Sequence, residues 1–393
     1  MTSKKKAFNR LKIISLFGVS QILGIFSILV LSLFIVKFHS VALWGYYAEL
    51  LIWTNLILLF LSFGNQDYLL KSFSNNPATI YQQWTNSLFS RSLLLLPSIA
   101  VVFFINAFKD LEIWIILLIL LQFLTQSFKV LIVYHRKYTF NIWVELCYNV
   151  FIFGGLLLKF ESLNISQLLQ IIVIAFFIRL VFYSLFLLKD CKKITFQIQV
   201  NEFKTSLPFF IPLALGTIRT KVDSYYGTHF FNAVTLSKYQ IFISFMMLAQ
   251  MASAFVITPY LKNFYRSNNS VLKSLQKQFF IFGWLFALIF MGAMYCALTL
   301  VYGFQFSAFQ YLLAFIFIVP LYIHVLLINE YYKKNLQHKI ALFAFIVVLI
   351  QLIFGYFIIK HEGINGALVV KAIGQWGIVA ILWLWLRKSK ING

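Results

Sequence analysis

Apolar runs long enough to cross a lipid bilayer recur along the whole chain, and they constrain its fold more than any other feature. A transmembrane helix needs about 20 predominantly apolar residues, and about twelve such runs follow one another with short polar connections. Hydrophobic residues make up 61% of the 393 positions and charged residues only 11%, whereas soluble domains contain roughly 45–50% and about 25%. We therefore predict an all-α polytopic membrane protein. The predicted spans are 13–36, 45–64, 92–108, 113–134, 140–158, 165–188, 207–226, 239–257, 279–300, 308–328, 340–359 and 364–386.

The distribution of basic residues predicts the orientation of these spans. The first apolar run is too long for the core of a signal peptide, so we expect it to remain as an uncleaved span. Lys and Arg are concentrated in the segment before this run and in alternate connections after it. Cytoplasmic loops carry such an excess, so both termini are predicted to be cytoplasmic. The other connections hold only Lys37, Lys109, Lys159, Lys238 and Lys360.

The seventh predicted span combines prolines with charges. Pro208 and Pro212 lie inside it, and Arg219, Lys221 and Asp223 follow at alternate positions. A proline inside a helix removes a backbone hydrogen bond, which in hydrocarbon must be replaced by a neighbouring group. Charges at this depth are tolerated where they face a cavity or each other. A broken helix beside such charges is typical of the substrate site of a transporter.

This span begins near the middle of the chain and separates two similar halves. Residues 38–46 align with residues 231–239 through a shared Phe, Val, Leu and Tyr, and each segment joins the first two spans of its half. We predict an N-terminal six-helix bundle at 1–190, a central cytoplasmic loop at 191–204 and a C-terminal six-helix bundle at 205–393. Six spans in each half make the two bundles parallel repeats, and we expect them to surround a central cavity.

Several charged side chains within the spans can meet one another. Arg219 lies about 20 Å from the start of its helix, at 1.5 Å per residue, and therefore near the middle of the membrane. Arg219 and Asp223 are four residues apart and share a helix face, so we expect them to pair. Glu145 and Arg179 lie at similar depth on consecutive antiparallel spans, which usually pack together. Each pair either stabilises its helices or contributes to the cavity. The candidate substrate-binding residues are Arg219, Lys221, Asp223, Arg179, Glu145 and Lys371.

Few other residues indicate chemistry. Lys129 lies near the end of its span and is expected to extend towards the membrane surface. The three cysteines and six histidines show no disulfide framework and no metal-ligand spacing. No pairing of a nucleophile with a base and no glycine-rich phosphate loop stands out. We therefore predict no catalytic residue, no metal and no cofactor, and the protein is not expected to be an enzyme.

The order of several short motifs resembles that of the bacterial polysaccharide (O-antigen type) flippases, which belong to the multidrug/oligosaccharidyl-lipid/polysaccharide (MOP) exporter superfamily. The motifs extend over nearly the whole chain, although each of them alone is degenerate. They are Gly45-Tyr46-Tyr47, Phe63-Gly64 with Tyr68-Leu69, Ser206-Leu207-Pro208 with Asp223, Tyr302-Gly303, and Gly363-Ile364-Asn365-Gly366-Ala367.

This resemblance implies export of oligosaccharides linked to undecaprenyl pyrophosphate, the precursors of O-antigen, capsule or exopolysaccharide, across the bacterial cytoplasmic (inner) membrane by alternating access. The expected partners are this lipid-linked substrate and membrane lipids, and other membrane proteins of polysaccharide assembly are further candidates. The hypothesis for Arg219 is that its guanidinium receives the diphosphate with two parallel donors. Coupling to a proton or to sodium is left open by the sequence.

Two alternative functions remain. A multidrug-type exporter of the same superfamily would share the fold, but its cavity should be acidic for cationic drugs, and these spans are basic. A membrane-embedded polysaccharide polymerase or ligase would need a large external loop, whereas the predicted external loops are shorter than active-site lids usually are. The net charge of +22 does not indicate nucleic acid, because lysines that fix membrane orientation produce the same excess.

Overall fold

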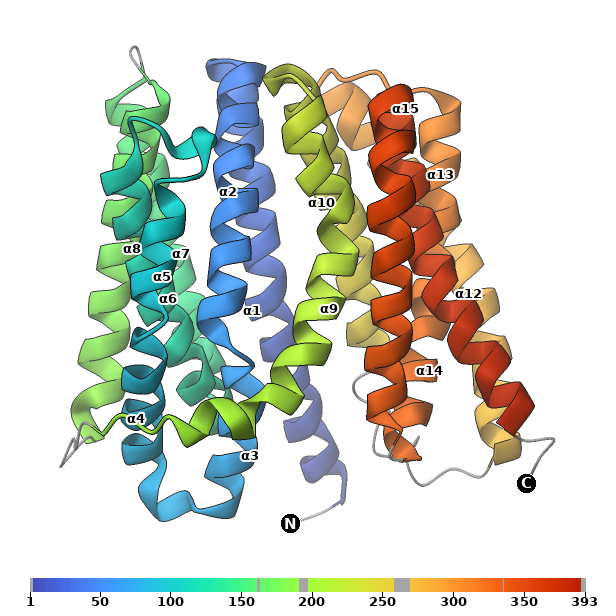
Figure 1. Cartoon of the computed structure of the whole chain (residues 1–393), viewed down its shortest axis with the longest axis horizontal. Coiled ribbons are helices and arrows are strands. Elements are labelled where there is room, and N and C mark those ends of the chain that lie inside the picture. The colour runs from blue at the N-terminus through green and yellow to red at the C-terminus, as the bar shows by residue number, and fades with distance from the viewer. Residues whose placement is uncertain (1–2, 161–162, 191–196, 258–268, 335, 390–393) are drawn as a thin grey trace. The chain divides into compact units, whose positions relative to one another are not determined.

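The computed structural model describes residues 3–160, 163–190, 197–257, 269–334 and 336–389, and helices dominate them (Figure 1). The chain divides into two compact units, Met1–Ala214 and Leu215–Gly393. The division falls inside helix α9 (Asn201–Phe230), so the last four residues of the predicted central loop are helical. Residues 191–196 of that loop lie outside the described residues. The limits of the two predicted bundles stay a prediction.

Unit 1 follows the predicted order of spans, and two of its helices, α2 (Val41–Ser62) and α8 (Ile165–Leu187), begin at a side-chain cap. The Ser40 side chain accepts a hydrogen bond from the Leu43 N–H at the start of α2. Asn164 and Gln167 form a reciprocal capping box at the start of α8, which satisfies two donors that the helix itself cannot pair. The helices are α1 (Ser3–Phe38), α2 (Val41–Ser62), α3 (Asn65–Asn75), α4 (Ile80–Ser92), α5 (Leu95–Val102), α6 (Glu112–His135), α7 (Tyr138–Leu158) and α8 (Ile165–Leu187).

The third span differs from the prediction. The expected single helix over 92–108 is wrong, because α5 has only eight residues and the span starts earlier. Residues Pro77–Ser92 and Leu95–Val102 are long and apolar enough to cross a membrane only when they are taken together, and the chain bends by 40° between them. Hydropathy missed α4 because this helix turns polar residues into the unit: Thr85, Asn86, Ser87, Ser90 and Arg91 are all buried.

The corner between α2 and α3 is fixed by a glycine. Gly64 has a φ of +71°, and a Cβ at this position would lie 2.7 Å from the backbone nitrogen of Phe210 in the first half of α9. Only glycine meets both demands without strain. Next to it, the ring of Phe63 stacks on that of Phe210, with 4.3 Å between the centroids. The predicted Phe63-Gly64 motif is therefore a packing device.

The helices from α9 onward follow the predicted order of spans, and α9 itself crosses the boundary between the units, with both of its prolines in unit 1. α9 is continuous, with Pro208 and Pro212 inside it, so the expected break in this helix is wrong. α13 (Ala308–Ile318) and α14 (Leu321–Lys333) together form one span around Pro320. α15 (Gln337–Ser389) is divided by non-helical Gly363, whose φ is 57°. The remaining helices are α10 (Ala233–Ile257) and α12 (Asn269–Cys296), followed by a π-helical turn at Ala297–Val301.

The number of spans agrees with the predicted number. Among the described residues, eight helices are long and apolar enough to cross a membrane, or nine when the bent α4–α5 pair is included. α15 counts once in this test although Gly363 divides it, and α9 and α10 are not among the helices that pass. With these taken into account, the all-α polytopic fold with twelve helices is confirmed.

Candidate functional site

Unit 1 contains a buried ion pair. Glu145 on α7 and Arg179 on α8 are each 6% exposed, and an Arg179 Nη2 donates to Glu145 Oε1. This is the pair expected from the depth of the two residues on consecutive spans, and it is confirmed. Breaking a buried pair leaves an uncompensated charge, which typically costs about 3–5 kcal/mol.

Polar and aromatic groups hold the Arg179 guanidinium in place. Its Nε and Nη2 donate to the Tyr183 hydroxyl at 3.3 and 3.2 Å, and this hydroxyl donates to Asn141 Oδ1 at 2.6 Å. The guanidinium also lies over the rings of Tyr148, Phe176 and Tyr183, at 5.4–5.7 Å from their centroids. Contacts of this kind attract a desolvated cation. No pattern in the sequence predicted these tyrosines as partners of Arg179.

A cavity of about 270 Å³ opens beside this pair, between α1, α2, α6, α7 and α8. Lys129 of α6 lines it and is exposed there. The side chain therefore faces the inside of the unit, and the expectation that it extends to the membrane surface is wrong. In the part of the chain that the structure describes, Lys129 has no ion pair within 4 Å. The ionisable residues that line the cavity are thus Lys129, Arg179 and Glu145, plus Tyr47 and Tyr148.

Unit 2 contains a second buried ion pair. Lys371 on α15 donates to both carboxylate oxygens of Asp223 on α9, at 3.0 and 3.1 Å, and to the Thr220 carbonyl at 2.8 Å. The Tyr239 hydroxyl and the Ser224 hydroxyl also donate to the same carboxylate. Asp223 is 0% exposed and Lys371 2%. Each unit therefore holds one ion pair in which both side chains are buried, with a tyrosine hydroxyl bonded to it, and unit 2 also has the partly exposed pair Lys334–Glu330 at 3.0 Å.

Arg219 does not pair with Asp223, which corrects the expected contact. Its Nη1 donates to the Gly374 carbonyl at 3.1 Å and to Gln375 Oε1 at 3.2 Å. The shared face predicted from the four-residue spacing is still real, because both side chains reach α15. Asp223 meets Lys371 there, while Arg219, one turn earlier on α9, meets Gln375 one turn later on α15. Such opposite progression is the geometry of antiparallel helices.

Lys221 is half-buried, and no ion pair within 4 Å involves it among the described residues. The six predicted residues therefore fall into two groups. Glu145 and Arg179 meet in unit 1, and Asp223 and Lys371 meet in unit 2, whereas Arg219 contacts only uncharged groups and Lys221 remains unpaired. No cluster of three metal-ligating side chains occurs in the described ranges.

The sequence analysis did not identify Arg91 and Lys129 of unit 1 as site residues. Arg91 was assigned to a connection, yet it is 4% exposed and lines a cavity inside unit 1 with Lys129. The available signal was the segment 80–92, in which polar residues recur at helical spacing next to an apolar run.

Comparison with solved structures identifies the fold. No protein-family model matches the sequence, and no curated protein matches it. Among solved structures, the lipid II flippase MurJ in an inward closed conformation is similar with a TM-score of 0.69 and 18% identity, over 96% of this chain and 87% of that one. An inward-facing multidrug resistance MATE family transporter of the MOP superfamily gives a TM-score of 0.70 and 11% identity, over 98% of both chains. A eukaryotic MATE transporter gives 0.62 and 13%, over 96% of both chains.

These similarities cover nearly the whole chain at low sequence identity, so they establish the fold and leave the substrate to be argued from the site. All three similar proteins are membrane transporters or flippases. The chain therefore has the multi-pass helical fold of MOP-type transporters.

Proposed function

We propose that the protein is a flippase that moves oligosaccharides linked to undecaprenyl pyrophosphate across the bacterial cytoplasmic membrane by alternating access. The observation that carries this proposal is the excess of positive charge in the cavity of unit 1. Lys129 and Arg179 face a single acid there, and Arg179 already neutralises that acid. Lys129 is then left as a positive charge exposed to the cavity.

This charge suits the most difficult part of such a substrate. The prenyl tail can stay in lipid and the glycan can follow a hydrated path, but a diphosphate must lose its hydration to enter the protein. Charge-assisted hydrogen bonds from Lys and Arg replace that hydration, and intramembrane charges commonly mark substrate pathways. The similarity to a lipid II flippase supports the same class of substrate.

A multidrug exporter is the second candidate, because MATE transporters match the fold equally well. The sign of the charge separates the two functions. A cavity that binds organic cations needs surplus acid, whereas the acids of the two sites, Glu145 and Asp223, are each occupied by a base.

The test is reconstitution of the full chain in liposomes. One sample contains a fluorescent undecaprenyl-diphosphate oligosaccharide, and its movement between leaflets is followed with a membrane-impermeant quencher. A parallel sample measures uptake of a cationic dye. We expect movement of the glycolipid above that in protein-free liposomes and no dye uptake. Dye uptake without movement of the glycolipid would favour the multidrug exporter and refute the flippase.

A further inference from the structure

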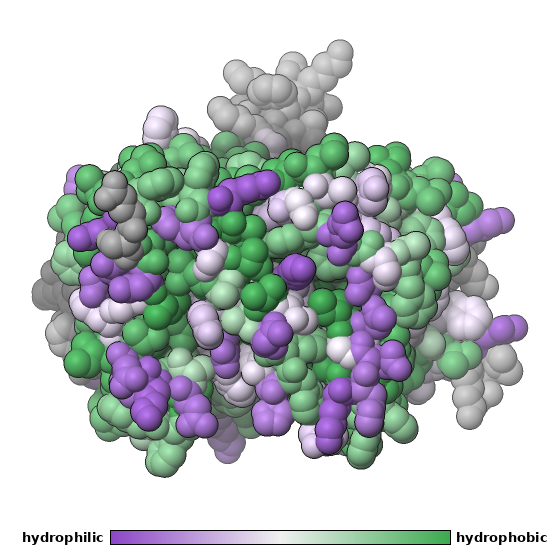
Figure 2. Space-filling model, turned by 90° about the horizontal axis from the view of Figure 1, so that it is seen from above, coloured by the Kyte–Doolittle hydropathy of each residue, from purple (hydrophilic) through white to green (hydrophobic). Residues whose placement is uncertain are grey.

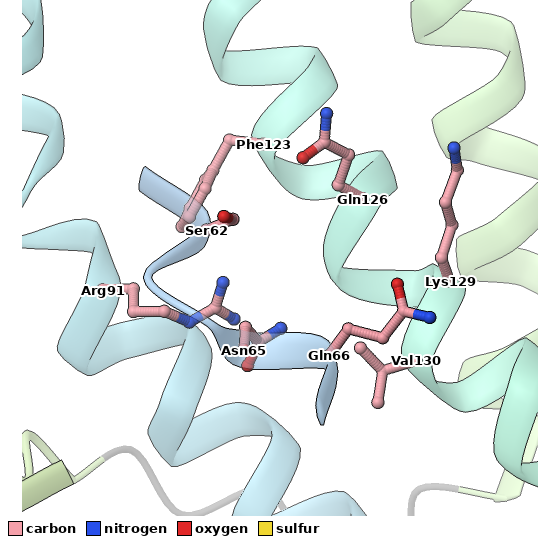
Figure 3. Close-up of a pocket in the computed structure, with 8 residues that line it drawn as sticks. All are labelled: Ser62, Asn65, Gln66, Arg91, Phe123, Gln126, Lys129 and Val130. Carbon is pink, nitrogen blue, oxygen red and sulfur yellow. The ribbon is translucent and has the colours of Figure 1, made fainter. Parts of the chain in front are cut away.

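A second cavity of unit 1, of about 190 Å³, lies between the α2–α3 corner, α4 and α6, and Figure 3 shows the residues that line it. Arg91 and Lys129 lie on opposite sides of the view, with Asn65 and Gln66 drawn between them, and the Lys129 side chain runs upward beside α6. Among the described residues that line it, none is Asp or Glu. We propose that this cavity binds a phosphate or diphosphate group, with Arg91 and Lys129 as its cationic ligands. The inference deepens the proposed function and rests on it for the source of the anion.

Arg91 provides the strongest argument, because it is buried with an unused donor. Its Nε donates to the Ser87 carbonyl and hydroxyl at 3.2 and 3.3 Å, and its guanidinium lies over the Phe123 ring at 5.5 Å from the centroid. Its Nη2 has no hydrogen-bond partner among the described residues. A buried donor left without a partner is costly, and more so when charged. An anionic oxygen in the cavity would remove this cost.

Asn65, which lines the cavity with Arg91, offers a further donor. The Ser87 hydroxyl, which accepts from Arg91, donates to Asn65 Oδ1 at 3.0 Å. Because the Asn65 oxygen is used in this way, its amide NH₂ remains available as a donor. Asn65 and Gln66 also begin α3, whose first turn has no side-chain cap in the described structure, and the N-terminus of a helix favours anions.

The charges that surround the cavity leave it positive. The acid with an electrostatic effect on Arg91 is Glu202 of α9, which is buried close to Ser87 and Ser90 and does not line the cavity. Asp67, in the first turn of α3, is exposed and also lies outside the lining. Among the described residues Lys129 forms no ion pair within 4 Å, and the acid with an electrostatic effect on it is Glu145, which already pairs with Arg179 and does not line this cavity. A single water needs about 10–15 Å³ of such volume, so the cavity has room for a polyatomic anion.

The first measurement is calorimetric titration of the purified full chain with inorganic diphosphate. We expect the wild-type chain to bind diphosphate with an affinity that falls as the ionic strength rises. Arg91→Gln and Lys129→Gln should each lower this affinity about tenfold or more, because each removes a charge-assisted hydrogen bond. Lys71→Gln is the matched control: it removes a basic residue of α3 that does not line the cavity, and its affinity should stay at the wild-type level.

Arg91 packs inside the unit, so Arg91→Gln can fail to fold. Lys129 is exposed and forms no ion pair within 4 Å among the described residues, so Lys129→Gln then decides the question alone. Wild-type affinity in Lys129→Gln, or no diphosphate binding by the wild-type chain, would overturn the proposal. Equal weakening by Lys71→Gln would also overturn it, because the anion would then respond only to surface charge.

A second measurement identifies the source of the anion. Binding of the protein is measured to nanodiscs that contain undecaprenyl diphosphate, to nanodiscs that contain undecaprenol, and to free diphosphate. Binding of the lipid diphosphate that depends on Arg91 and Lys129 assigns the site to a lipid headgroup, whereas binding of free diphosphate alone assigns it to a soluble anion; both outcomes support the oxyanion site.

The site and the proposed function can fail independently. If the site binds diphosphate but no glycolipid moves in liposomes, the proposed function fails and the site stands. If glycolipid moves while both variants bind diphosphate normally, the site fails and the function stands.

Discussion

The partner of Asp223 can be identified by comparing two double-mutant cycles. Asp223→Asn removes a charge that is 0% exposed and leaves the Lys371 ammonium with the Thr220 carbonyl and the Phe317 ring. Lys371→Met removes the base and leaves the carboxylate with two hydroxyl donors. Each single change should destabilise the protein by about 3–5 kcal/mol, the usual cost of an uncompensated buried charge. The double change should cost less than the sum by about 2–3 kcal/mol.

Arg219 supplies the control cycle. Arg219→Met removes hydrogen bonds to Gly374 and Gln375, which costs about 1.5–3 kcal/mol for a charged donor. Since no ion pair joins Arg219 to Asp223, the double variant with Asp223→Asn should be additive within about 0.5 kcal/mol.

The assay is reversible unfolding of the purified chain in mixed detergent micelles, with circular dichroism to confirm that every variant retains its helices. If the destabilisations caused by Lys371→Met and Asp223→Asn simply added in the double variant, the pairing would be refuted. A coupling larger for Arg219 than for Lys371 would show that the pair expected from the four-residue spacing forms instead.

Three further predictions test the fold and the first unit. Glu145→Gln and Arg179→Gln should each destabilise the protein by about 3–5 kcal/mol and their combination by less than the sum, measured in the same micelles; strict additivity would show that the two residues do not meet. Gly64→Ala should sharply lower the amount of folded protein, because its φ is positive and a Cβ would lie 2.7 Å from Phe210 N, whereas Gly24→Ala, with no atom within 4 Å of the new Cβ, should be tolerated; equal yields on size-exclusion chromatography would contradict this. Cysteines introduced as Ser3→Cys and Asn392→Cys should resist an impermeant thiol reagent in intact cells, because the basic connections predict cytoplasmic termini, and labelling of either would refute that topology.

Most of the fold could be predicted because its main signal is local. An apolar run of membrane length specifies a helix regardless of what surrounds it, so spans such as α6 and α8 were located within a few residues. α4 lacks this signal, because it buries Asn86, Ser87 and Arg91 against other helices of unit 1. A helix that satisfies its polar groups inside a bundle reads as a polar connection until the bundle is known.

The candidate site was predictable only where its residues are close in sequence. Glu145 and Arg179 lie on consecutive helices, and sequential antiparallel helices usually pack together, so their pairing followed from depth alone. Asp223 and Lys371 are 148 positions apart, and their contact depends on which face of α15 packs against α9. The local rule of four residues instead favoured Arg219, and tertiary packing overrides that rule here.

The two buried pairs suggest how the protein separates stability from recognition. A charge that is neutralised by a buried partner stabilises its unit but offers little attraction to a ligand, because its hydrogen bonds are already used. Glu145–Arg179 and Asp223–Lys371 both meet this description. Arg91, Lys129, Lys221 and Arg219 do not, since in the described residues none of them has an ion pair within 4 Å. Arg91 and Arg219 are buried, and a buried charge that forms no ion pair lowers the stability of the unit that holds it, whereas the exposed Lys129 carries no such cost.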